Sequence, residues 1–301
     1  MIIGGNKDKV IENIKKNIKN EEFNNKVELN DPVLSDEKRD KVIKKFYKIR
    51  NNRFLFYLRR RPAFIYTSYI GLKLDKYIEI EGLDNLKDIK NGAIITSNHF
   101  NPIDNMIIRK LIKKYYKKNL YIVIQETNLD MPGFLGYLMN HLNIIPLSKS
   151  VNYIINTFKP ELKKVLDKKN YVLIYPEEEM WFNYKKPRPC KKGAYQFAFD
   201  SNVPVISCFV EMVNLEDDDN EQFKQIKYIL HVLKPIYKDE KKSYRENIVY
   251  MANKDYEQKK ECYEKVYNKK LDYNFSYDDI AGLKKKKRWF YSSFFIYFIY
   301  S

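Results

Sequence analysis

Short runs of β-branched and aromatic residues alternate with helical stretches through the centre of the chain, and this order narrows the folds that the sequence can adopt. The strand-like runs lie at residues 77–81, 93–97, 121–125, 171–175, 203–211 and 228–234. The helical patterns lie between them, at residues 102–117, 133–140, 151–169 and 193–201. Strands that alternate with helices of this length predict an α/β fold, in which helices cover both faces of a sheet.

Both ends of the chain add helical segments to this central part. Residues 1–37 are polar and contain an Asn-Asp-Pro sequence, which predicts a loosely attached arm with one short helix. Apolar residues recur at near-helical spacing among basic residues in the segment 35–60, so we expect a basic amphipathic helix that is broken at Pro62. Residues 243–269 predict one long charged helix, appended to the central part.

The length of 301 residues fits one core with helical additions better than two full domains. We therefore predict a single-domain mixed sheet flanked by helices, with N- and C-terminal helical extensions. The predicted parts are a polar arm with the basic amphipathic helix (1–61), the α/β domain (62–238), a C-terminal helical appendage (239–283) and a basic-aromatic tail (284–301).

A histidine stands where the strand-like run at 93–97 meets a helix start. Asn101 followed by Pro102 predicts that start, which places His99 on the turn and Asp104 in the first helical turn. A carboxylate that binds one imidazole nitrogen leaves the other as a proton acceptor, the arrangement of a general base. Backbone N–H groups at the helix start would also favour an anion. The alternative is that Asp104 only closes a capping box on Asn101.

A second polar motif follows the strand-like run at 171–175, and together the two motifs resemble the glycerolipid acyltransferases. Their first block reads NH-x4-D, and a later block has a strand followed by F-P-E-G-T-R. The matching residues are Asn98, His99, Asp104, Pro176, Glu177, Lys191, Gly193, Ala194, Val203, Pro204 and Val205. The order and spacing of the blocks agree over roughly residues 75–235.

The resemblance implies the fold of that family and transfer of a fatty acyl group from acyl-CoA or acyl carrier protein to a hydroxyl of a glycerolipid acceptor in phospholipid synthesis. One candidate acceptor is 1-acylglycerol 3-phosphate. The implied catalytic residues are His99 as the general base, Asp104 as the residue that orients it and Glu177 as the residue that shapes the acceptor site. The residues implied for substrate binding are Asn98, Asn101, Pro176, Arg188, Lys192 and Gly193. No resident cofactor and no metal is expected.

The sequence departs from the family pattern directly after Glu177. Glu178, Glu179 and Met180 stand where the family has Gly-Thr-Arg, so the arginine expected to hold an acceptor phosphate is replaced by Met180. Arg188 in the following basic loop is the candidate to supply the missing charge, because guanidinium groups bind phosphate bidentately. The alternatives are a solvated basic loop and, since the two extra glutamates repel phosphate, a neutral acceptor.

The formal net charge of +17 favours binding to polyanions such as an anionic lipid surface or nucleic acid, although a compositional bias towards Lys, Asn, Ile and Tyr explains it equally well. No segment approaches the roughly 20 apolar residues of a spanning helix, and residues 1–16 do not resemble a signal peptide. The basic cluster at 284–288 and the aromatic stretch at 289–300 favour shallow docking on lipid. We expect a cytoplasmic protein, peripheral on the inner face of the membrane, with membrane lipids and the acyl donor as partners.

Two other functions stay open at this point. A basic nucleic-acid-binding protein is supported by charge and aromatic residues alone, so no nucleic acid partner is expected. An inactive, lipid-binding relative of the acyltransferases is supported by the changed Gly-Thr-Arg segment. Three widely spaced cysteines favour neither a disulfide framework nor a zinc site, and the three consecutive glutamates lack an accompanying histidine for a metal.

Overall fold

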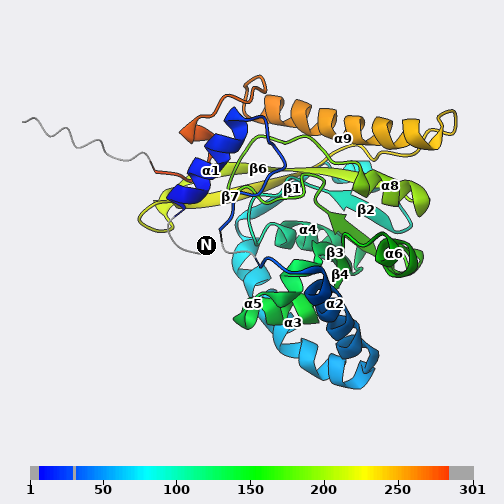
Figure 1. Ribbon diagram of the computed structural model, residues 1–301. Helices are drawn as coiled ribbons and strands as arrows, with labels where there is room; N and C mark the ends of the chain where they lie inside the picture. Colours follow the sequence, from blue (N-terminus) through cyan, green and yellow to red (C-terminus); the bar gives the residue numbers. More distant parts are fainter. Residues whose placement is uncertain (1–6, 30–31, 285–301) are drawn as a thin grey trace, which may run out of the picture.

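A mixed sheet of seven strands forms the centre of the computed structural model, which describes residues 7–29 and 32–284 (Figure 1). The strands lie in the order β1-β7-β6-β2-β5-β3-β4. β6 and β7 pair antiparallel, and the other neighbours pair parallel. The bounds are β1 (Ile78–Glu81), β2 (Ala93–Thr96), β3 (Leu120–Gln125), β4 (Ile144–Leu147), β5 (Tyr171–Ile174), β6 (Val205–Asp218) and β7 (Lys224–Val232). The predicted α/β fold with a mixed sheet is confirmed.

Helices cover both faces of this sheet (Figure 1). One core joins the sheet to α2, α3 and α4, and a second core on the other face joins it to α7, α8 and α9. Successive residues of β2 alternate between the two cores, as a strand requires, with Ala93 and Ile95 in the first and Ile94 in the second. The helix bounds are α1 (Asp8–Lys19), α2 (Asp36–Asn51), α3 (Arg53–Asp75), α4 (Asn105–Leu111), α5 (Gly133–His141), α6 (Val151–Tyr153), α7 (Lys159–Asp167), α8 (Gly193–Asp200) and α9 (Tyr244–Val266).

The two central parallel strands bring the two sequence motifs to one edge of the sheet. β2 pairs with β5 from Ala93 opposite Tyr171 to Thr96 opposite Ile174, so both strands end at the same level. The chain leaves β2 towards His99 and leaves β5 towards Glu177. Ligands of open α/β sheets bind outside these carboxyl ends, so the topology places both motifs where a site is expected.

The predicted break at Pro62 is wrong, because Pro62 lies inside α3. The break falls instead at Asn52, whose side chain accepts a hydrogen bond from the backbone N–H of Leu55 at 3.1 Å. Proline removes one helical hydrogen bond, but Leu58, whose carbonyl loses its donor, is 41% exposed and open to water. The predicted division between residues 61 and 62 therefore falls within one continuous helix.

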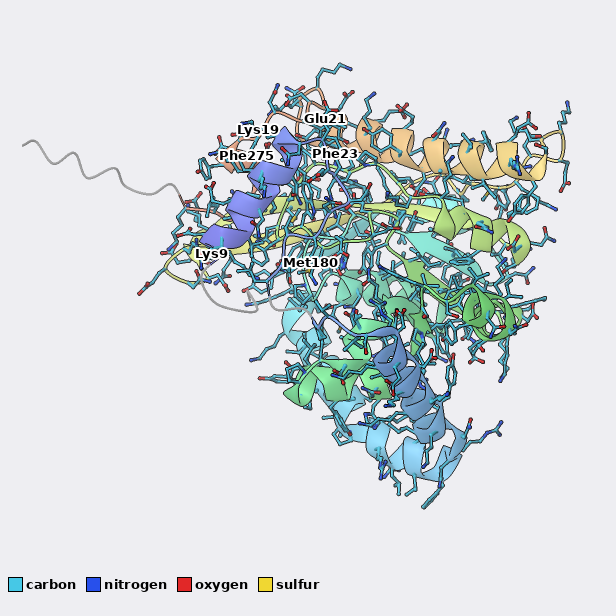
Figure 2. All side chains as sticks on the ribbon, in the orientation of Figure 1. Lys9, Lys19, Glu21, Phe23, Met180 and Phe275 are labelled. Atoms are coloured by element: carbon cyan, nitrogen blue, oxygen red, sulfur yellow. The ribbon has the colours of Figure 1, made fainter. Side chains whose placement is uncertain are left out.

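The N-terminal arm is not loosely attached, contrary to the prediction. α1 buries a stripe made of Val10, Ile11, Ile14 and Ile18. This stripe belongs to a core with Trp181, Phe182 and Phe223, and Phe23 and Phe275 pack against the same core near the C-terminal end of α1 (Figure 2). The stripe recurs at helical spacing, so amphipathicity was present in a segment whose overall polarity suggested a free arm.

The C-terminal helix also packs against the sheet domain. α9 is the long charged helix predicted from sequence. It begins at the capping box of Ser243 and Glu246 and contacts β6 and α8. Inside that contact Lys259 Nζ lies 2.8 Å from Asp255 Oδ2, which also accepts a 2.5 Å hydrogen bond from the Tyr195 hydroxyl. The predicted basic-aromatic tail at 285–301 lies outside the described residues. Within the described part of the chain, no helix combines the length and apolar character needed to cross a membrane.

Candidate active site

His99 and Asp104 lie in direct contact at the carboxyl end of β2. The distance from His99 Nδ1 to Asp104 Oδ2 is 2.7 Å. The Asp104 side chain is 3% exposed and the His99 side chain 21%, so the imidazole is open on one side. Because a carboxylate only accepts, Nδ1 carries the hydrogen and Nε2 is left with a free lone pair. The contact that the sequence predicted is present.

The same carboxylate also fixes the turn before α4. Asp104 Oδ2 accepts hydrogen bonds from the backbone N–H groups of Phe100 at 3.0 Å and Asn101 at 3.3 Å. Asp104 therefore closes the turn and binds the imidazole at once, so the predicted contact is present beside one of the two hydrogen bonds of a capping box. The Ile103 N–H donates to Asn101 Oδ1, and α4 itself begins at Asn105. The amides of Phe100, Asn101 and Ile103 donate to side chains of this turn, so these three are not free for the anion that the sequence predicted there.

Tyr175 completes the surroundings of this pair. Its ring stacks on the imidazole of His99 with a centroid distance of 3.9 Å and an interplanar angle of 13°. Its hydroxyl donates to Asp104 Oδ1 at 2.5 Å. Burial raises the pKa of Tyr175 well above its usual value, and the negative charge of Asp104 adds to that shift, so the hydroxyl stays a donor. Tyr175 thus holds both the ring and the carboxylate in place.

The substitution Tyr175→Phe keeps the ring and removes this hydrogen bond. A hydrogen bond to a charged group contributes about 1.5–3 kcal/mol, so we expect the free energy of unfolding in urea to fall by that amount. The matched control is Tyr69→Phe on α3, where the tyrosine is 51% exposed and no change is expected. Equal stability of the two variants would show that the Tyr175 hydroxyl does not support Asp104.

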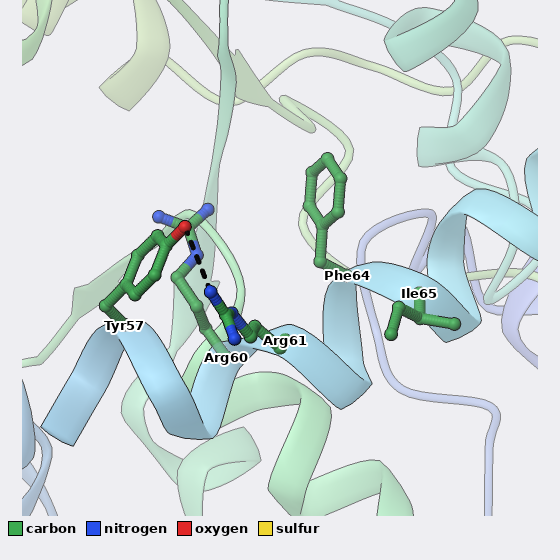
Figure 3. Close-up of a pocket in the computed structure, with 5 residues that line it drawn as sticks. All are labelled: Tyr57, Arg60, Arg61, Phe64 and Ile65. Atoms are coloured by element: carbon green, nitrogen blue, oxygen red, sulfur yellow. Dashed lines mark hydrogen bonds between the residues drawn. The ribbon is translucent and has the colours of Figure 1, made fainter.

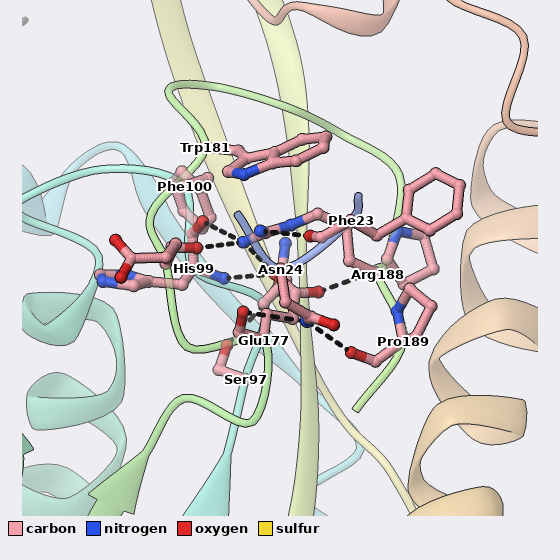
Figure 4. Close-up of polar contacts among 12 residues, drawn as sticks. Phe23, Asn24, Ser97, His99, Phe100, Glu177, Trp181, Arg188 and Pro189 are labelled. Carbon is pink, nitrogen blue, oxygen red and sulfur yellow. Dashed lines mark hydrogen bonds and ion pairs between the residues drawn. The ribbon is translucent and has the colours of Figure 1, made fainter. Parts of the chain in front are cut away.

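Glu177 and Arg188 form a buried ion pair behind His99 (Figure 4). Glu177 Oε2 lies 2.9 Å from Arg188 Nη2 and accepts from the His99 backbone N–H at 3.1 Å, while Oε1 accepts from the Arg188 N–H at 2.9 Å. The two side chains are 2% and 1% exposed. Glu177 therefore holds the backbone of His99 rather than facing an open surface.

Arg188 is surrounded by protein, whereas the sequence suggested that it supplies the charge for an acceptor phosphate. Its guanidinium donates to the carbonyl oxygens of Phe23 at 2.9 Å, His99 at 3.3 Å and Glu179. Burial lowers the pKa of Arg188, and the charge of Glu177 opposes that shift. The contacts tie the turn after β2, the loop after β5 and the N-terminal arm to one cation.

The other predicted binding residues fall into two groups. Asn98 exchanges two hydrogen bonds with the backbone of Val210 on β6, at 3.1 and 2.8 Å, and so fixes the turn after β2. Asn101 donates to Asn183 Oδ1 at 3.1 Å. Like these two, Pro176 is buried close to the ion pair, whereas Lys192 and Gly193 are exposed where α8 begins. No contact described for Lys192 or Gly193 reaches His99 or Asp104.

Sequence reasoning missed the contribution of the arm to this region. Asn24 Nδ2 donates to the carbonyl oxygens of Glu177 at 3.1 Å and Pro189 at 2.9 Å (Figure 4). Trp181 Nε1 donates to the Asn25 carbonyl at 2.8 Å. These partners are far apart in sequence, and a local pattern gives no signal for such pairs. Across residues 7–29 and 32–284, no cluster of three or more His, Cys, Asp or Glu side chains forms a metal site.

The segment that contains both motifs is similar to a known protein family. The family model described as "Acyltransferase" matches residues 77–211, which contain β1 to β5, α4 and both motifs. Residues 77–211 are therefore similar to the acyltransferase family.

One solved structure is also similar to the chain. It is the crystal structure of the 1-acyl-sn-glycerophosphate (LPA) acyltransferase PlsC from Thermotoga maritima, with 16% sequence identity and a TM-score of 0.44. The match covers 77% of this chain and 90% of that one. No curated protein sequence matches the chain.

Proposed function

We propose that the protein is an O-acyltransferase that moves a fatty acyl group from acyl-CoA or acyl carrier protein to a hydroxyl of a glycerolipid acceptor. The observation that carries the proposal is the 2.7 Å contact between His99 and Asp104 inside the segment that is similar to the acyltransferase family. The contact leaves Nε2 of a partly exposed imidazole free to accept a proton, which is the group that such a transfer needs.

The proposed reaction uses His99 as base and then as acid. Nε2 takes the proton of the acceptor hydroxyl while the hydroxyl oxygen attacks the carbonyl carbon of the donor thioester. The carbon–sulfur bond then breaks, and the imidazolium returns the proton to the leaving thiolate. Asp104 holds the imidazole in the tautomer that accepts at Nε2 and stabilises the imidazolium. The thioester supplies the activated acyl group, so no acyl-enzyme and no resident cofactor takes part.

Glu177 is proposed to shape the acceptor site by holding the backbone of His99 in position. Its Oε2 accepts from the His99 N–H, and its charge is balanced by Arg188. A base displaced by about 1 Å loses much of its efficiency, because proton transfer requires hydrogen-bond distance in the bound complex. The ion pair of Glu177 and Arg188 therefore supports the reaction by fixing the turn that carries His99.

We further propose that α3 places the enzyme on the inner face of the membrane. The helix presents apolar and basic side chains together, a pattern that suits the headgroup layer of an anionic leaflet. The exposed apolar members, which we call the α3 surface, are Phe54, Leu55, Tyr57, Leu58, Phe64, Ile65, Tyr66, Tyr69 and Leu72. Exposed arginines at positions 53, 59 and 61 lie on the same helix. α3 lies next to α4, which follows His99, so docking would bring the base close to lipid.

One experiment tests the reaction and the location together. Purified protein is incubated with acyl-CoA or acyl carrier protein donors and with lysolipids in vesicles that contain or lack phosphatidylglycerol. The lipid products are identified by mass. The protein bound to the vesicles is measured by sedimentation. We expect an acylated lipid and stronger sedimentation with the anionic vesicles. Sedimentation without product would favour the inactive lipid-binding relative. Salt-sensitive binding to DNA or RNA without thioester consumption would favour a nucleic-acid-binding protein.

A further inference from the structure

The carboxylate that holds the proposed base is shared between the imidazole and a tyrosine hydroxyl. Asp104 Oδ2 binds His99 Nδ1 at 2.7 Å and accepts the backbone N–H groups of Phe100 and Asn101. Asp104 Oδ1 accepts the Tyr175 hydroxyl at 2.5 Å, and no other donor to Oδ1 is found in the part of the chain that the structure describes. The Asp104 side chain is 3% exposed, so little water competes for that oxygen.

The hydroxyl of Tyr175 is a feature that this chain adds to the motif after β5. Tyr175 stands where the block F-P-E-G-T-R has phenylalanine. A phenylalanine ring could stack on the imidazole of His99 as the tyrosine ring does, with its centroid at 3.9 Å. It could not donate to Asp104. The stacking therefore needs only the aromatic ring, whereas the hydrogen bond to the carboxylate needs the hydroxyl.

The hydrogen bond from Tyr175 changes how strongly Asp104 acts on the imidazole. A donor that binds one carboxylate oxygen stabilises part of the negative charge, so the carboxylate becomes a weaker acceptor for its other donors. A buried network feels this difference more than an exposed one, because water screens it less. Asp104 then still orients the ring of His99 but favours the imidazolium less strongly. The hydroxyl thus favours the neutral, proton-accepting ring.

No other group around this network replaces the Tyr175 hydroxyl. The further charged or titratable groups on the surrounding loops, on α4 and on β7 are Glu177, Glu178, Glu179, Arg188, Arg109 and Tyr228. The charges of Glu177 and Arg188 balance each other at 2.9 Å. Among the described residues, none of the six donates a hydrogen bond to Asp104. The direct contact that divides the charge of the carboxylate is therefore that of Tyr175.

We propose that Tyr175 is a positioning residue that tunes the base, because its hydroxyl takes up part of the charge of Asp104 and so keeps His99 in the neutral form that accepts a proton. The inference rests on the proposed acyltransferase function. The proton still moves from the acceptor hydroxyl to Nε2 of His99. Tyr175 keeps its own proton, since burial and the charge of Asp104 raise its pKa. The hydroxyl extends towards acid the pH range in which the base works.

The test compares Tyr175→Phe with Tyr228→Phe, which removes a buried hydroxyl on β7 that makes no described hydrogen bond to Asp104. The ratio kcat/KM is measured from about pH 5 to 8 with acyl-CoA and a lysolipid in detergent micelles. The rate falls towards acid as the base is protonated. We expect this acidic limb to move to higher pH by about 0.5–1 unit in Tyr175→Phe, because more of the carboxylate charge then stabilises the imidazolium.

Tyr228→Phe should keep the wild-type limb. An unmoved limb in Tyr175→Phe, or a limb moved to lower pH, would overturn the proposal. If Tyr175→Phe does not fold, site-specific replacement of Tyr175 by 3-fluorotyrosine tests the same point with the opposite sign. The fluorinated phenol keeps the ring and donates more strongly, so the limb should move to lower pH.

A second tyrosine limits the pH range of this experiment. Tyr57 on α3 lies beside Arg61, whose guanidinium donates to the tyrosine hydroxyl at 3.5 Å (Figure 3). This hydrogen bond lowers the pKa of Tyr57, so ionisation of Tyr57 would change the charge of the α3 surface on the alkaline side. An upper limit of about pH 8 keeps that group out of the measured limb, and micelles in place of vesicles remove the contribution of membrane docking.

A second readout does not depend on turnover. The proton on His99 Nδ1 is observed by NMR and assigned by its absence from His99→Ala. A stronger hydrogen bond to Asp104 moves this resonance downfield, so we expect a downfield shift in Tyr175→Phe. The proton between His231 Nε2 and Glu211, a contact of 2.8 Å, is the internal reference and should not move.

An unchanged or upfield His99 resonance in Tyr175→Phe would overturn the role of Tyr175. If the wild type acylates no lysolipid, the proposed function fails, and the resonance of His99 still decides whether Tyr175 weakens the hold of Asp104 on the imidazole.

Discussion

Replacing His99 by alanine is expected to lower the rate of acyl transfer by about 10²–10⁴-fold, the usual contribution of a general base. The variant loses the imidazole whose Nε2 is left to accept the hydroxyl proton, because the ring Nδ1 is held by Asp104. Folding should be retained, since the imidazole is partly exposed and its removal leaves Asp104 bound to Phe100, Asn101 and Tyr175. The rate is measured as product formed from acyl-CoA and a lysolipid.

The matched control is His231→Ala on β7. His231 lies between Glu211 at 2.8 Å and Glu81 at 3.3 Å, and no contact described for it reaches Asp104 or Glu177. We expect this variant to keep the wild-type rate. Circular dichroism and vesicle sedimentation check that both variants fold and bind lipid. Wild-type turnover by His99→Ala, with both checks passed, would remove His99 from the mechanism.

The parts of the fold that depend on local sequence patterns were predictable. The strand-like runs and helical stretches correspond to elements of the sheet domain, because β-branched runs and helical periodicity are local properties. β4 was missed because Pro146 interrupts its short apolar run. Proline is compatible with a strand at the edge of a sheet, where it need not donate to a second neighbour, and β4 is such an edge.

At the candidate active site, too, contacts between residues close in sequence were predictable and contacts between distant residues were not. The contact of His99 with Asp104 lies within one turn, so spacing and helix-start chemistry were enough to predict it. The contacts of Arg188 join residues far apart in sequence, and only the packing of the arm brings Phe23 to that guanidinium. Sequence therefore indicated a charge near the site but not whether it faced a ligand or the protein.

Arg188→Met is expected to lower the free energy of unfolding by about 3–5 kcal/mol, the range for breaking a buried ion pair by removing one partner. Glu177 would stay buried without its counter-charge, and the carbonyl oxygens of Phe23, His99 and Glu179 would each lose a donor. Urea unfolding followed by tryptophan fluorescence measures the change, because the side chain of Trp181 is buried beside Arg188. The control Lys192→Met removes an exposed charge near the same loop and should change stability by less than about 0.5 kcal/mol.

The double variant Glu177→Gln with Arg188→Met separates the charge from the other contacts. Glutamine still accepts from the His99 N–H, and no unpaired carboxylate is left, so the double variant should be more stable than Arg188→Met alone. Such a result identifies Arg188 as the cation that holds three segments behind the base. A stable Arg188→Met protein with a raised KM for a phosphorylated acceptor would instead restore the phosphate-binding role that the sequence suggested.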